Sequence, residues 1–549
     1  MKRIKQPFLL ILCVWVLHGC QVTKPLPGTD TFHWHSANLY FLLVDRFYNG
    51  DPSNDQAIVR NSPTGVLRGF EGGDLRGVIK KLDEGYFRDL GVNVIWMTPI
   101  VEQIHGSVDE STGNTYGFHG YWTRDWTRID PAYGTEADLQ ELISKAHKQG
   151  IRILLDAVIN HTGPVTAKDP VWPNEWVRTG PPCDYSSYAA FTDCTLVENL
   201  PDIRTESNEE VDLPPHLIAK WRAEGRYESE MASLDAFFAR TGLPRAPKYY
   251  IMKWLLDYIE KYGIDGYRVD TVKHTTEDIW AEFSTLARES YERYLDKTPV
   301  PAFPDQEFFL LGEVYGYGIS GGQYYHFSDA KVNYFENGFD NLINFDFKSD
   351  AQLPYHQLFD KYAQVNKTTL QDVGITNYLS SHDDGHPFDG QRQRSFEAAN
   401  KLLLAPGVSQ IYYGDETDRL LSVEGAVGDA NLRSFMNWDD LRLDASKQEL
   451  LQHYQKLGQF RRNHPAIGAG THHEISRIPY VFSRKWAENG VKDQVIVVLD
   501  RKNAEAIAVS SVFANGDKIR DAYSGETAVV KHGLVRFKNS NYILLLEKM

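Results

Sequence analysis

The spacing of apolar and polar positions follows two patterns along the chain, and the first pattern gives way to the second near residue 466. Before that point, short apolar runs alternate with longer stretches that have the 3.6-residue spacing of amphipathic helices. The apolar runs predict eight buried strands, at residues 39–45, 92–99, 151–160, 264–270, 308–314, 343–347, 375–380 and 408–414. After His464-Pro465 the runs are short and closely spaced, as at 495–500, 506–511 and 542–547, which predicts a small antiparallel β domain.

The number of strand–helix units decides the predicted fold class. Eight nearly continuous apolar strands, each followed by a helical stretch, predict an α/β fold of the (β/α)8 TIM-barrel type. Several strands follow a glycine suited to end a helix, as at Gly91, Gly150 and Gly263. An open doubly wound sheet is the alternative, but no GxGxxG motif follows the first strand.

Two intervals interrupt the alternation of strands and helices that is predicted for the barrel. Residues 162–204 are rich in proline, glycine, aspartate and aromatic residues, which predicts an irregular domain inserted after the third strand. A helical stretch around 216–240 is longer than such a connection needs. The predicted organisation is a signal segment (1–20), a barrel in two parts (30–161 and 205–466), the inserted domain (162–204) and a C-terminal antiparallel β-sandwich domain (467–549).

The first twenty residues have the pattern of an export signal. Basic residues between Lys2 and Lys5 precede an apolar run at 8–17, which is too short for a usual transmembrane helix. The sequence Leu17-His18-Gly19-Cys20 is similar to a bacterial lipobox, in which Cys20 carries lipid and begins the mature chain. Plain secretion with cleavage nearby is the alternative. No later run predicts a membrane span, so we expect membrane contact only through the lipid anchor.

Net charge and cysteine content limit the classes of binding partner and the cellular compartment that we expect for this protein. The formal net charge of −16 argues against nucleic acid or anionic lipid as the main partner. Of the four cysteines, Cys13 leaves with the signal and Cys20 would carry lipid. The remaining pair, Cys183 and Cys194, predicts a disulfide in an oxidising compartment, with two free cysteines as the alternative.

Three acidic residues, Asp270, Glu313 and Asp383, each stand at or close after the end of an apolar run. Burying a charge is costly unless it is paired, so a salt bridge at the barrel end is the alternative for each acid alone. Three such acids together favour an active site at the carboxyl ends of parallel strands. Glycoside hydrolysis is above all the chemistry that uses one protonated and one ionised carboxyl group.

Six segments, in this order, resemble those of the α-amylase family of glycoside hydrolases: GVNVIWMTP (91–99), DAVINH (156–161), LPDI (200–203), GYRVDTVKH (266–274), LLGEVYG (310–316) and SHD (381–383). The resemblance implies that Asp270 is the nucleophile, Glu313 the general acid and Asp383 the carboxylate that holds sugar hydroxyls. Clustered carboxylates cannot all ionise cheaply, so the acid must have the raised pKa. Arg268, on the same strand face as Asp270, can keep the nucleophile ionised.

The same resemblance implies further contacts with the sugar. His161, His274 and His382 end three different strands and would bind hydroxyl groups, although a lone histidine is more often a structural residue. Apolar sugar faces suit aromatic rings, so Tyr121 would stack on the substrate. The remaining residues that the resemblance assigns to substrate binding are His119, Trp122, Arg268, Lys273 (on the leaving-group side) and Arg433.

Calcium is the cofactor that the resemblance implies. A first site would join the inserted domain to the barrel through oxygen atoms of Asn160, Asp202, His274 (backbone) and the backbone near Thr192. A second site would lie in the segments NGDPSND and GGD, with the ligands Asn49, Asp51, Asn54, Asp55, Gly72 and Asp74. A turn rich in Asx residues is the alternative for the second cluster.

The residues and the resemblance together predict a retaining endo-hydrolase of α-1,4-glucosidic bonds in starch, glycogen or maltooligosaccharides. A transglycosylase of the same family, of the cyclodextrin glucanotransferase or maltogenic kind, is the first alternative, and an enzyme acting on sucrose or α-1,6 links is another. A surface glucan-binding protein without catalysis is a third, although a pure binder need not keep all three acids. We expect a monomer in a bacterial cell envelope, lipid-anchored or secreted.

Overall fold

The structure is a computed structural model that describes residues 32–488, 490–503 and 506–549. The predicted signal segment and the lipobox cysteine Cys20 lie outside the described residues. Within the described ranges, every helix is too short or too polar to span a bilayer.

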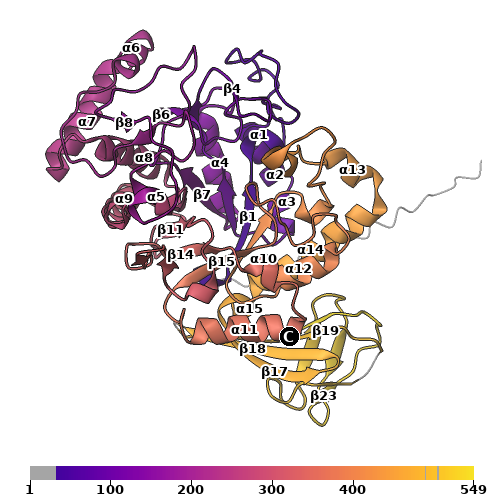
Figure 1. Ribbon diagram of the computed structural model, residues 1–549. Helices are drawn as coiled ribbons and strands as arrows, with labels where there is room; N and C mark the ends of the chain where they lie inside the picture. The colour runs from indigo at the N-terminus through magenta and orange to yellow at the C-terminus, as the bar shows by residue number, and fades with distance from the viewer. Residues whose placement is uncertain (1–31, 489, 504–505) are drawn as a thin grey trace, which may run out of the picture. The chain divides into compact units, whose positions relative to one another are not determined.

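Eight parallel strands close into a barrel, which confirms the predicted fold class. Around the barrel the order is β1, β2, β7, β10, β11, β14, β15, β16 and back to β1. Figure 1 shows β1, β7, β11, β14 and β15 of this barrel near the middle of the picture. The strands are β1 (Asn38–Leu42), β2 (Val94–Met97), β7 (Arg152–Ala157), β10 (Gly266–Val269), β11 (Phe309–Gly312), β14 (Asn341–Asn344), β15 (Gly374–Tyr378) and β16 (Val408–Tyr412). Each overlaps one of the eight predicted apolar runs and is shorter than that run.

Every residue of these eight strands is buried, which explains why their sequences are nearly continuous in apolar residues. Inside the barrel, Phe41 of β1 stacks on Trp96 of β2 with ring centroids 3.6 Å apart. The residues of a predicted run that lie outside its strand precede the strand, follow it or do both. The third run, for example, continues past Ala157 to Asn160, which lies on the rim.

Helices follow the strands and pack against them and against each other. The α-helices of the barrel and its connections are α1 (Val44–Phe47), α2 (Leu75–Asp83), α3 (Tyr86–Asp89), α4 (Glu136–Lys148), α8 (Pro247–Tyr262), α9 (Glu277–Lys297), α10 (Phe347–Asp350), α11 (Tyr355–Lys367), α12 (Ser395–Leu403), α13 (Trp438–Leu443), α14 (Ala445–Asn463) and α15 (Ala466–Ala469). Gly263 ends α8 in the left-handed conformation, as its position predicts. A Cβ atom there would lie 2.0 Å from the Tyr294 ring, so any other residue would force that ring to move.

The segment after β7 has little regular structure, as predicted. It contains the two-residue strands β8 (Val177–Arg178) and β9 (Asp202–Ile203), which pair with each other, and the short helix α5 (Ala189–Thr192). Cys183 and Cys194 form a disulfide, which confirms the predicted bond. Two-stranded antiparallel sheets elsewhere are formed by β3 (Val101–Gln103) with β6 (Thr123–Ile129), by β4 (Val108–Asp109) with β5 (Asn114–Thr115), and by β12 (Tyr325–His326) with β13 (Lys331–Val332).

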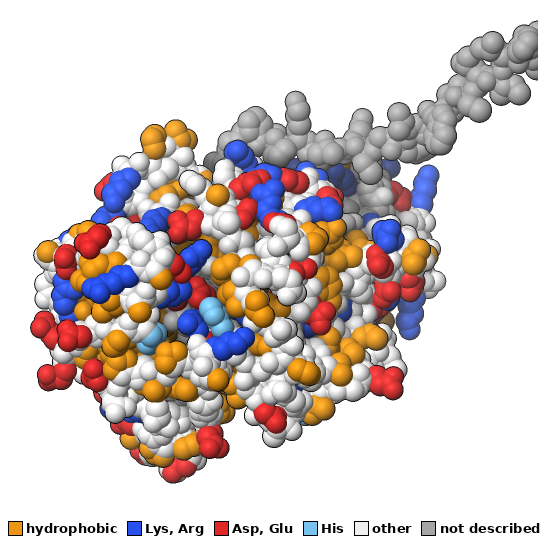
Figure 2. Space-filling model, turned by 90° about the horizontal axis from the view of Figure 1, so that it is seen from above, with side chains coloured by type: hydrophobic (Ala, Val, Ile, Leu, Met, Phe, Trp, Pro, Cys, Tyr) orange, Lys and Arg blue, Asp and Glu red, His pale blue; other side chains and the backbone are white. Residues whose placement is uncertain are grey.

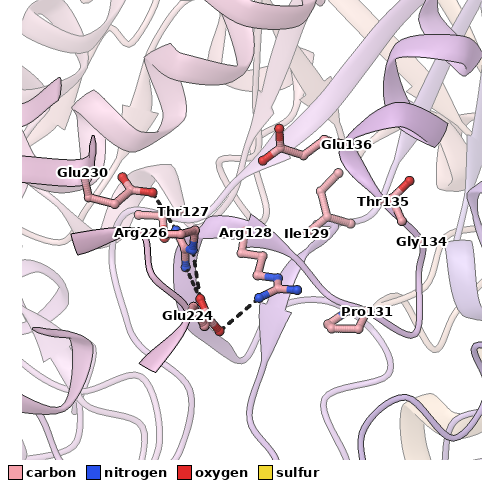
Figure 3. A pocket seen from close by; sticks show the side chains of 10 residues that line it. All are labelled: Thr127, Arg128, Ile129, Pro131, Gly134, Thr135, Glu136, Glu224, Arg226 and Glu230. Carbon is pink, nitrogen blue, oxygen red and sulfur yellow. Dashed lines mark hydrogen bonds and ion pairs between the residues drawn. The ribbon is translucent and has the colours of Figure 1, made fainter. Parts of the chain in front are cut away.

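The predicted extra helical stretch is two helices, α6 (Pro215–Ala223) and α7 (Tyr227–Thr241). The turn between them is tied to β6 by an ion pair of Glu224 with Arg128 at 3.0 Å (Figure 3). Within the turn, Glu224 also contacts Arg226 at 2.6 Å. Arg226 also contacts Glu230 at 2.5 Å. These residues line a cavity of about 480 Å³ that includes none of the three predicted catalytic acids.

The C-terminal region is antiparallel, which agrees with the predicted β domain. One sheet has the order β17 (Thr471–Arg477), β18 (Tyr480–Glu488), β19 (Val491–Leu499), β24 (Leu544–Lys548), β21 (Lys518–Asp521) and β22 (Thr527–Val529), and β20 (Ile507–Ala508) pairs with β23 (Leu534–Val535). His464, just after α14, joins this sheet to the barrel region. Its ring contacts Asp493 of β19 at 2.8 Å and Glu547 of β24 at 2.7 Å.

Candidate active site

The three predicted acids lie where barrel strands end. Asp270 follows β10 directly, Glu313 follows β11 directly, and Asp383 is five residues beyond β15. Strands of one parallel barrel end on one rim, so the topology brings these residues to the same end of the barrel. Figure 2 shows histidine side chains next to basic and acidic ones near the middle of one face of the molecule.

One buried arginine connects the acids at the centre of the rim. Arg268 Nη1 donates to Asp270 Oδ1 at 2.7 Å and to Asp156 Oδ1 at 3.0 Å. The Nη2 atom of the same guanidinium lies 3.3 Å from Glu313 Oε2. The Arg268 side chain is 1% exposed, so its charge is poorly screened by water and acts strongly on all three carboxyl groups.

Glu313 has the environment of a general acid. Burial and the negative charges of Asp270 and Asp383 raise the pKa of its carboxyl group to about 8, although Arg268 opposes this. The carboxyl group accepts a 2.9 Å hydrogen bond from the backbone N–H of Thr271. Glu313 can therefore stay protonated at neutral pH, as proton donation to a leaving group requires.

Asp383 has the opposite environment. Burial alone would raise its pKa, but His382, Arg433 and Arg268 outweigh burial and hold it well below the usual range. Arg433 Nη2 contacts Asp383 Oδ1 at 2.6 Å, and His382 Nε2 lies 2.9 Å from Asp383 Oδ2. Its side chain is 35% exposed, against 8% for Glu313, so a ligand can reach this fixed negative charge.

Asp156, on β7, is a fourth carboxyl group at this centre, and the sequence analysis did not single it out. Burial raises its pKa to about 7, with Arg268 opposing and Asp270 adding to the shift. It accepts hydrogen bonds from Tyr121 Oη at 2.8 Å and from Trp96 Nε1 at 3.1 Å. Its signal in the sequence was its place at the head of the DAVINH segment.

The residues of the GFHGYW segment do not all face the same way. Tyr121 stacks on the His382 ring, with centroids 5.4 Å apart, and lies beside the acids. His119 accepts a hydrogen bond from the Tyr121 backbone N–H at 3.1 Å. Trp122 is 8% exposed and packs in a small apolar cluster with Ile104 and Leu200. The ring of Trp122 is therefore largely covered by protein.

The other two predicted histidines make contacts with the backbone. His161 Nε2 lies 3.1 Å from the Tyr121 carbonyl oxygen, and His274 Nδ1 lies 3.2 Å from the Phe191 carbonyl oxygen. The contact of His274 links the segment after β10 to helix α5 of the inserted region. Lys273, beside it, is also buried within protein contacts.

The first predicted calcium cluster has unsatisfied oxygen atoms. Asn160 and Asp202 are brought together by the hydrogen bond from the Ile203 N–H to the Asn160 carbonyl oxygen, at 2.8 Å. The side-chain oxygen of Asn160 and the Oδ1 atom of Asp202 are buried without a hydrogen-bond partner. Because an unpaired buried oxygen is costly, these atoms fit a hard cation such as Ca²⁺. Thr192 follows Phe191, whose carbonyl oxygen contacts His274 Nδ1, so Thr192 also lies near His274.

The second predicted calcium cluster is also assembled, with one exception. Gly72 has φ +89°, and a Cβ atom there would lie 2.5 Å from Asn49 Nδ2 and 2.8 Å from Asp55 Oδ1. The side-chain oxygens of Asn49 and Asn54 are buried without partners, which fits a cation. Asp74 accepts a 3.1 Å hydrogen bond from Asn54.

The exception is Asp51, whose carboxylate is engaged in a local turn with Ser53 through a 2.6 Å hydrogen bond from the hydroxyl group. Among the described residues, no group of three or more His, Cys, Asp and Glu side chains is arranged to hold a metal. Both calcium clusters depend on amide and backbone oxygens, which Ca²⁺ accepts alongside carboxylates.

A family comparison agrees with this geometry. The model of the alpha amylase catalytic domain matches residues 41–442. The chain belongs to the alpha-amylase family. Family membership confirms the prediction of a glycoside hydrolase.

Sequence relatives agree with membership of the alpha-amylase family, and solved structures share the fold. The periplasmic alpha-amylase of Escherichia coli K12 is 36% identical over 509 residues, which cover 80% of this chain and 69% of that protein. A cyclomaltodextrin glucanotransferase of Geobacillus stearothermophilus is 27% identical over 500 residues, and the chain spans only 61% of its length. The crystal structure of an alpha-amylase from Geobacillus thermoleovorans shares the fold, with a TM-score of 0.65, 21% identity and coverage of 94% of this chain and 99% of that one.

Proposed function

We propose that the protein is a retaining, endo-acting hydrolase of α-1,4-glucosidic bonds in starch, glycogen or maltooligosaccharides. The observation that carries the proposal is the placement of two acids at one guanidinium. Arg268 contacts both Asp270 and Glu313, yet burial keeps the pKa of Glu313 raised. A protonated and an ionised carboxyl group held side by side are what double displacement at a sugar carbon requires.

In the proposed reaction, Asp270 attacks the anomeric carbon while Glu313 donates its proton to the departing glycosidic oxygen. The bond to the leaving sugar breaks as the bond to Asp270 forms, giving a covalent glycosyl-enzyme intermediate. Glu313, now ionised, takes a proton from a water molecule, which attacks the same carbon and releases Asp270. Asp383 would hold sugar hydroxyls and favour the positive charge that develops on the ring.

Three variants test these roles. Asp270→Asn, Glu313→Gln and Asp383→Asn should each lower kcat by orders of magnitude without lowering the melting temperature by more than a few degrees. Asp184→Asn is a control, because that side chain is exposed and bonds only within its own turn. Proton NMR of the first products should show the α-anomer. Near-wild-type turnover in Asp270→Asn, or a β-anomeric product, would contradict the proposal.

The second candidate is a transglycosylase of the same family, which the similarity to cyclomaltodextrin glucanotransferases favours. A transferase passes the glycosyl group from the intermediate to a sugar hydroxyl instead of to water. Incubation with soluble starch followed by chromatography separates the two, because cyclic or elongated products mark transfer and short linear ones mark hydrolysis. A non-catalytic glucan-binding protein would release no reducing sugar at all.

We also propose that Ca²⁺ binds at both clusters of unsatisfied oxygens. Asn160 and Asp202, with backbone oxygens near Thr192 and at His274, would join the inserted region to the barrel. Asn49, Asn54, Asp55, Gly72 and Asp74 would form the second site. The ion would supply positive charge that fixes these loops, and no step of the reaction passes through it.

The proposed location is the bacterial cell envelope, with lipid on Cys20. The support is the lipobox-like sequence together with the similarity to a periplasmic alpha-amylase. Cys20→Ala should release a soluble form of the enzyme from the membrane fraction, which activity assays on separated fractions can follow. A native mature chain that begins at another residue would contradict the lipoprotein proposal and favour plain secretion.

A further inference from the structure

Lys273 lies beside the segment that carries Glu313 and is surrounded by protein. It belongs to the short 3-10 turn η2 (Val272–His274) after β10, and it is 8% exposed. Its ammonium group donates to the Tyr315 carbonyl oxygen at 2.8 Å and to the Tyr325 hydroxyl at 3.0 Å. Rings of Phe191, Tyr315 and Tyr325 surround it, with centroids 5.0 to 5.5 Å from Nζ. Two of its three N–H groups are thus used inside the protein.

Three successive residues after the nucleophile hold the segment of the acid. The Thr271 backbone N–H donates to the Glu313 carboxyl group at 2.9 Å, and the Val272 N–H donates to the Glu313 carbonyl oxygen at 3.0 Å. Lys273 adds the third contact, two residues further along, at Tyr315. Residues 271–273 therefore hold the side chain of Glu313, its backbone and the segment that follows.

The second hydrogen bond of Lys273 extends this arrangement to the β12–β13 hairpin. Tyr325 begins β12, and the hairpin is bound in turn to the disulfide-containing loop of the inserted region. There the Ser328 hydroxyl donates to the Ser186 carbonyl oxygen at 2.5 Å, and the Tyr188 N–H donates to Asp329 at 2.7 Å. Through its ammonium group, Lys273 thereby links the segment of Glu313 to the β12–β13 hairpin and, through the hairpin, to the loop around Ser186. These two segments lie far apart in the sequence.

We propose that Lys273 is a positioning residue for Glu313, in addition to the leaving-group sugar contact that family resemblance implies. The inference rests on the proposed hydrolase function. Proton transfer depends steeply on geometry, because a displacement of about 1 Å can cost about 100-fold in rate. Losing the tether should therefore slow the chemical step for every sugar leaving group, whatever its length.

The test compares two variants with a matched control. Lys273→Met keeps the length of the side chain and removes its charge, and Tyr325→Phe removes only the hydroxyl that Lys273 contacts. Lys331→Met is the control, since this exposed lysine lies on the same hairpin with its ammonium 4.5 Å from the centre of the Tyr324 ring. We would measure kcat and KM on maltooligosaccharides of increasing length and on an aryl maltoside with an activated leaving group. The pH profile of each variant and its melting temperature complete the set.

We expect Lys273→Met to lower kcat on all the oligosaccharides by about 10- to 100-fold, with KM changed less than about threefold. The aryl maltoside should lose much less, because its leaving group needs no proton. The alkaline limb of the pH profile should move to lower pH, since a loosened segment admits water to Glu313. Tyr325→Phe should act in the same direction with a smaller effect, and it carries the test if Lys273→Met does not fold.

Two results would overturn the inference. One is an unchanged kcat with a KM that rises as the leaving-group side of the substrate lengthens, which would identify a sugar contact. The other is an unchanged pH profile in both variants. Wild-type turnover in the same assays tests the proposed hydrolase function separately.

Discussion

Arg268 Nη1 lies 2.7 Å from Asp270 Oδ1, two residues along the same strand end, and the same nitrogen contacts Asp156. A single cation thus serves carboxyl groups from two adjacent strands, β10 and β7, and its other terminal nitrogen faces Glu313 of β11. The negative charges of these carboxyl groups are therefore compensated by the single Arg268 side chain, which is 1% exposed.

Arg268→Met should therefore affect stability as well as rate. Removing one partner of a buried charge pair leaves an uncompensated charge, which costs about 3–5 kcal/mol in the free energy of unfolding. Denaturant unfolding followed by tryptophan fluorescence measures the loss, and kcat should fall with it. Arg88→Met is the control, because its pair with Asp89 is exposed and such changes stay within about 0.5 kcal/mol. Equal stabilities of the two variants would contradict this account.

The pH dependence of activity should report Glu313. Its pKa is raised to about 8, so the carboxyl group is protonated below that pH and loses its proton above it. Because the proposed acid must carry the proton, kcat/KM should fall as the pH rises through about 8. In Glu313→Gln, the residual activity on an activated aryl glycoside should no longer fall in this range. An alkaline limb that persists in the variant would assign it to another group.

Removal of calcium should lower stability and activity together. A ligand that binds only the folded state stabilises it by mass action, so chelation should lower the melting temperature, and added Ca²⁺ should restore it. Asp202→Asn should weaken the response at the first site and Asp55→Asn at the second. Asp184→Asn leaves both clusters intact and should respond as the wild type does. Calorimetry with and without a chelator decides the matter, and an unchanged melting temperature would refute both sites.

The contact between the barrel region and the C-terminal sheet should depend on pH through His464. Burial would lower its pKa, but hydrogen bonds to Asp493 and Glu547 raise it to about 9, above the value of 6.5 expected in the unfolded chain. The stability that protonated His464 provides is therefore fully present below pH 6.5 and is lost as the pH rises through about 9.

Unfolding experiments at pH 6 and pH 9.5 test this linkage. The wild type should lose about 1.4 kcal/mol for each unit by which the folded pKa exceeds the unfolded one. His464→Gln should remove that part of the pH dependence, whereas His473→Gln, at an exposed position on β17, should leave it unchanged. The prediction fails if the two variants show the same pH dependence.

The sequence was most informative where one physical rule dominates. Strands of a parallel barrel are buried on both faces, so their apolar runs were predictable, and an acid such as Glu313 stood out because it ends such a run. Asp156 did not stand out, because it lies inside a predicted run. The structure shows that β7 ends one residue later and that the Asp156 carboxylate faces Arg268.

Elements that depend on distant contacts were not predictable. The β12–β13 hairpin has only two residues in each strand, which is too short for an alternating pattern. Its position depends on contacts with Lys273 and with the loop around Ser186, more than fifty and more than one hundred residues away respectively.

The predicted single helical stretch proved to be two helices, because the chain turns at Gly225, which has φ +70°.

The closure of the barrel has a consequence for the order in which the chain folds. Strand β1 pairs with β16, and the bond between Asn38 and Ser409 spans 371 positions. At about 5–20 residues per second, roughly 20–70 seconds of synthesis separate these two strands, during which the hydrogen-bonding edge of β1 has no partner. The barrel can therefore close only after the catalytic region has been translated almost completely, whereas the loop closed by Cys183 and Cys194, which are 11 positions apart, can form far earlier.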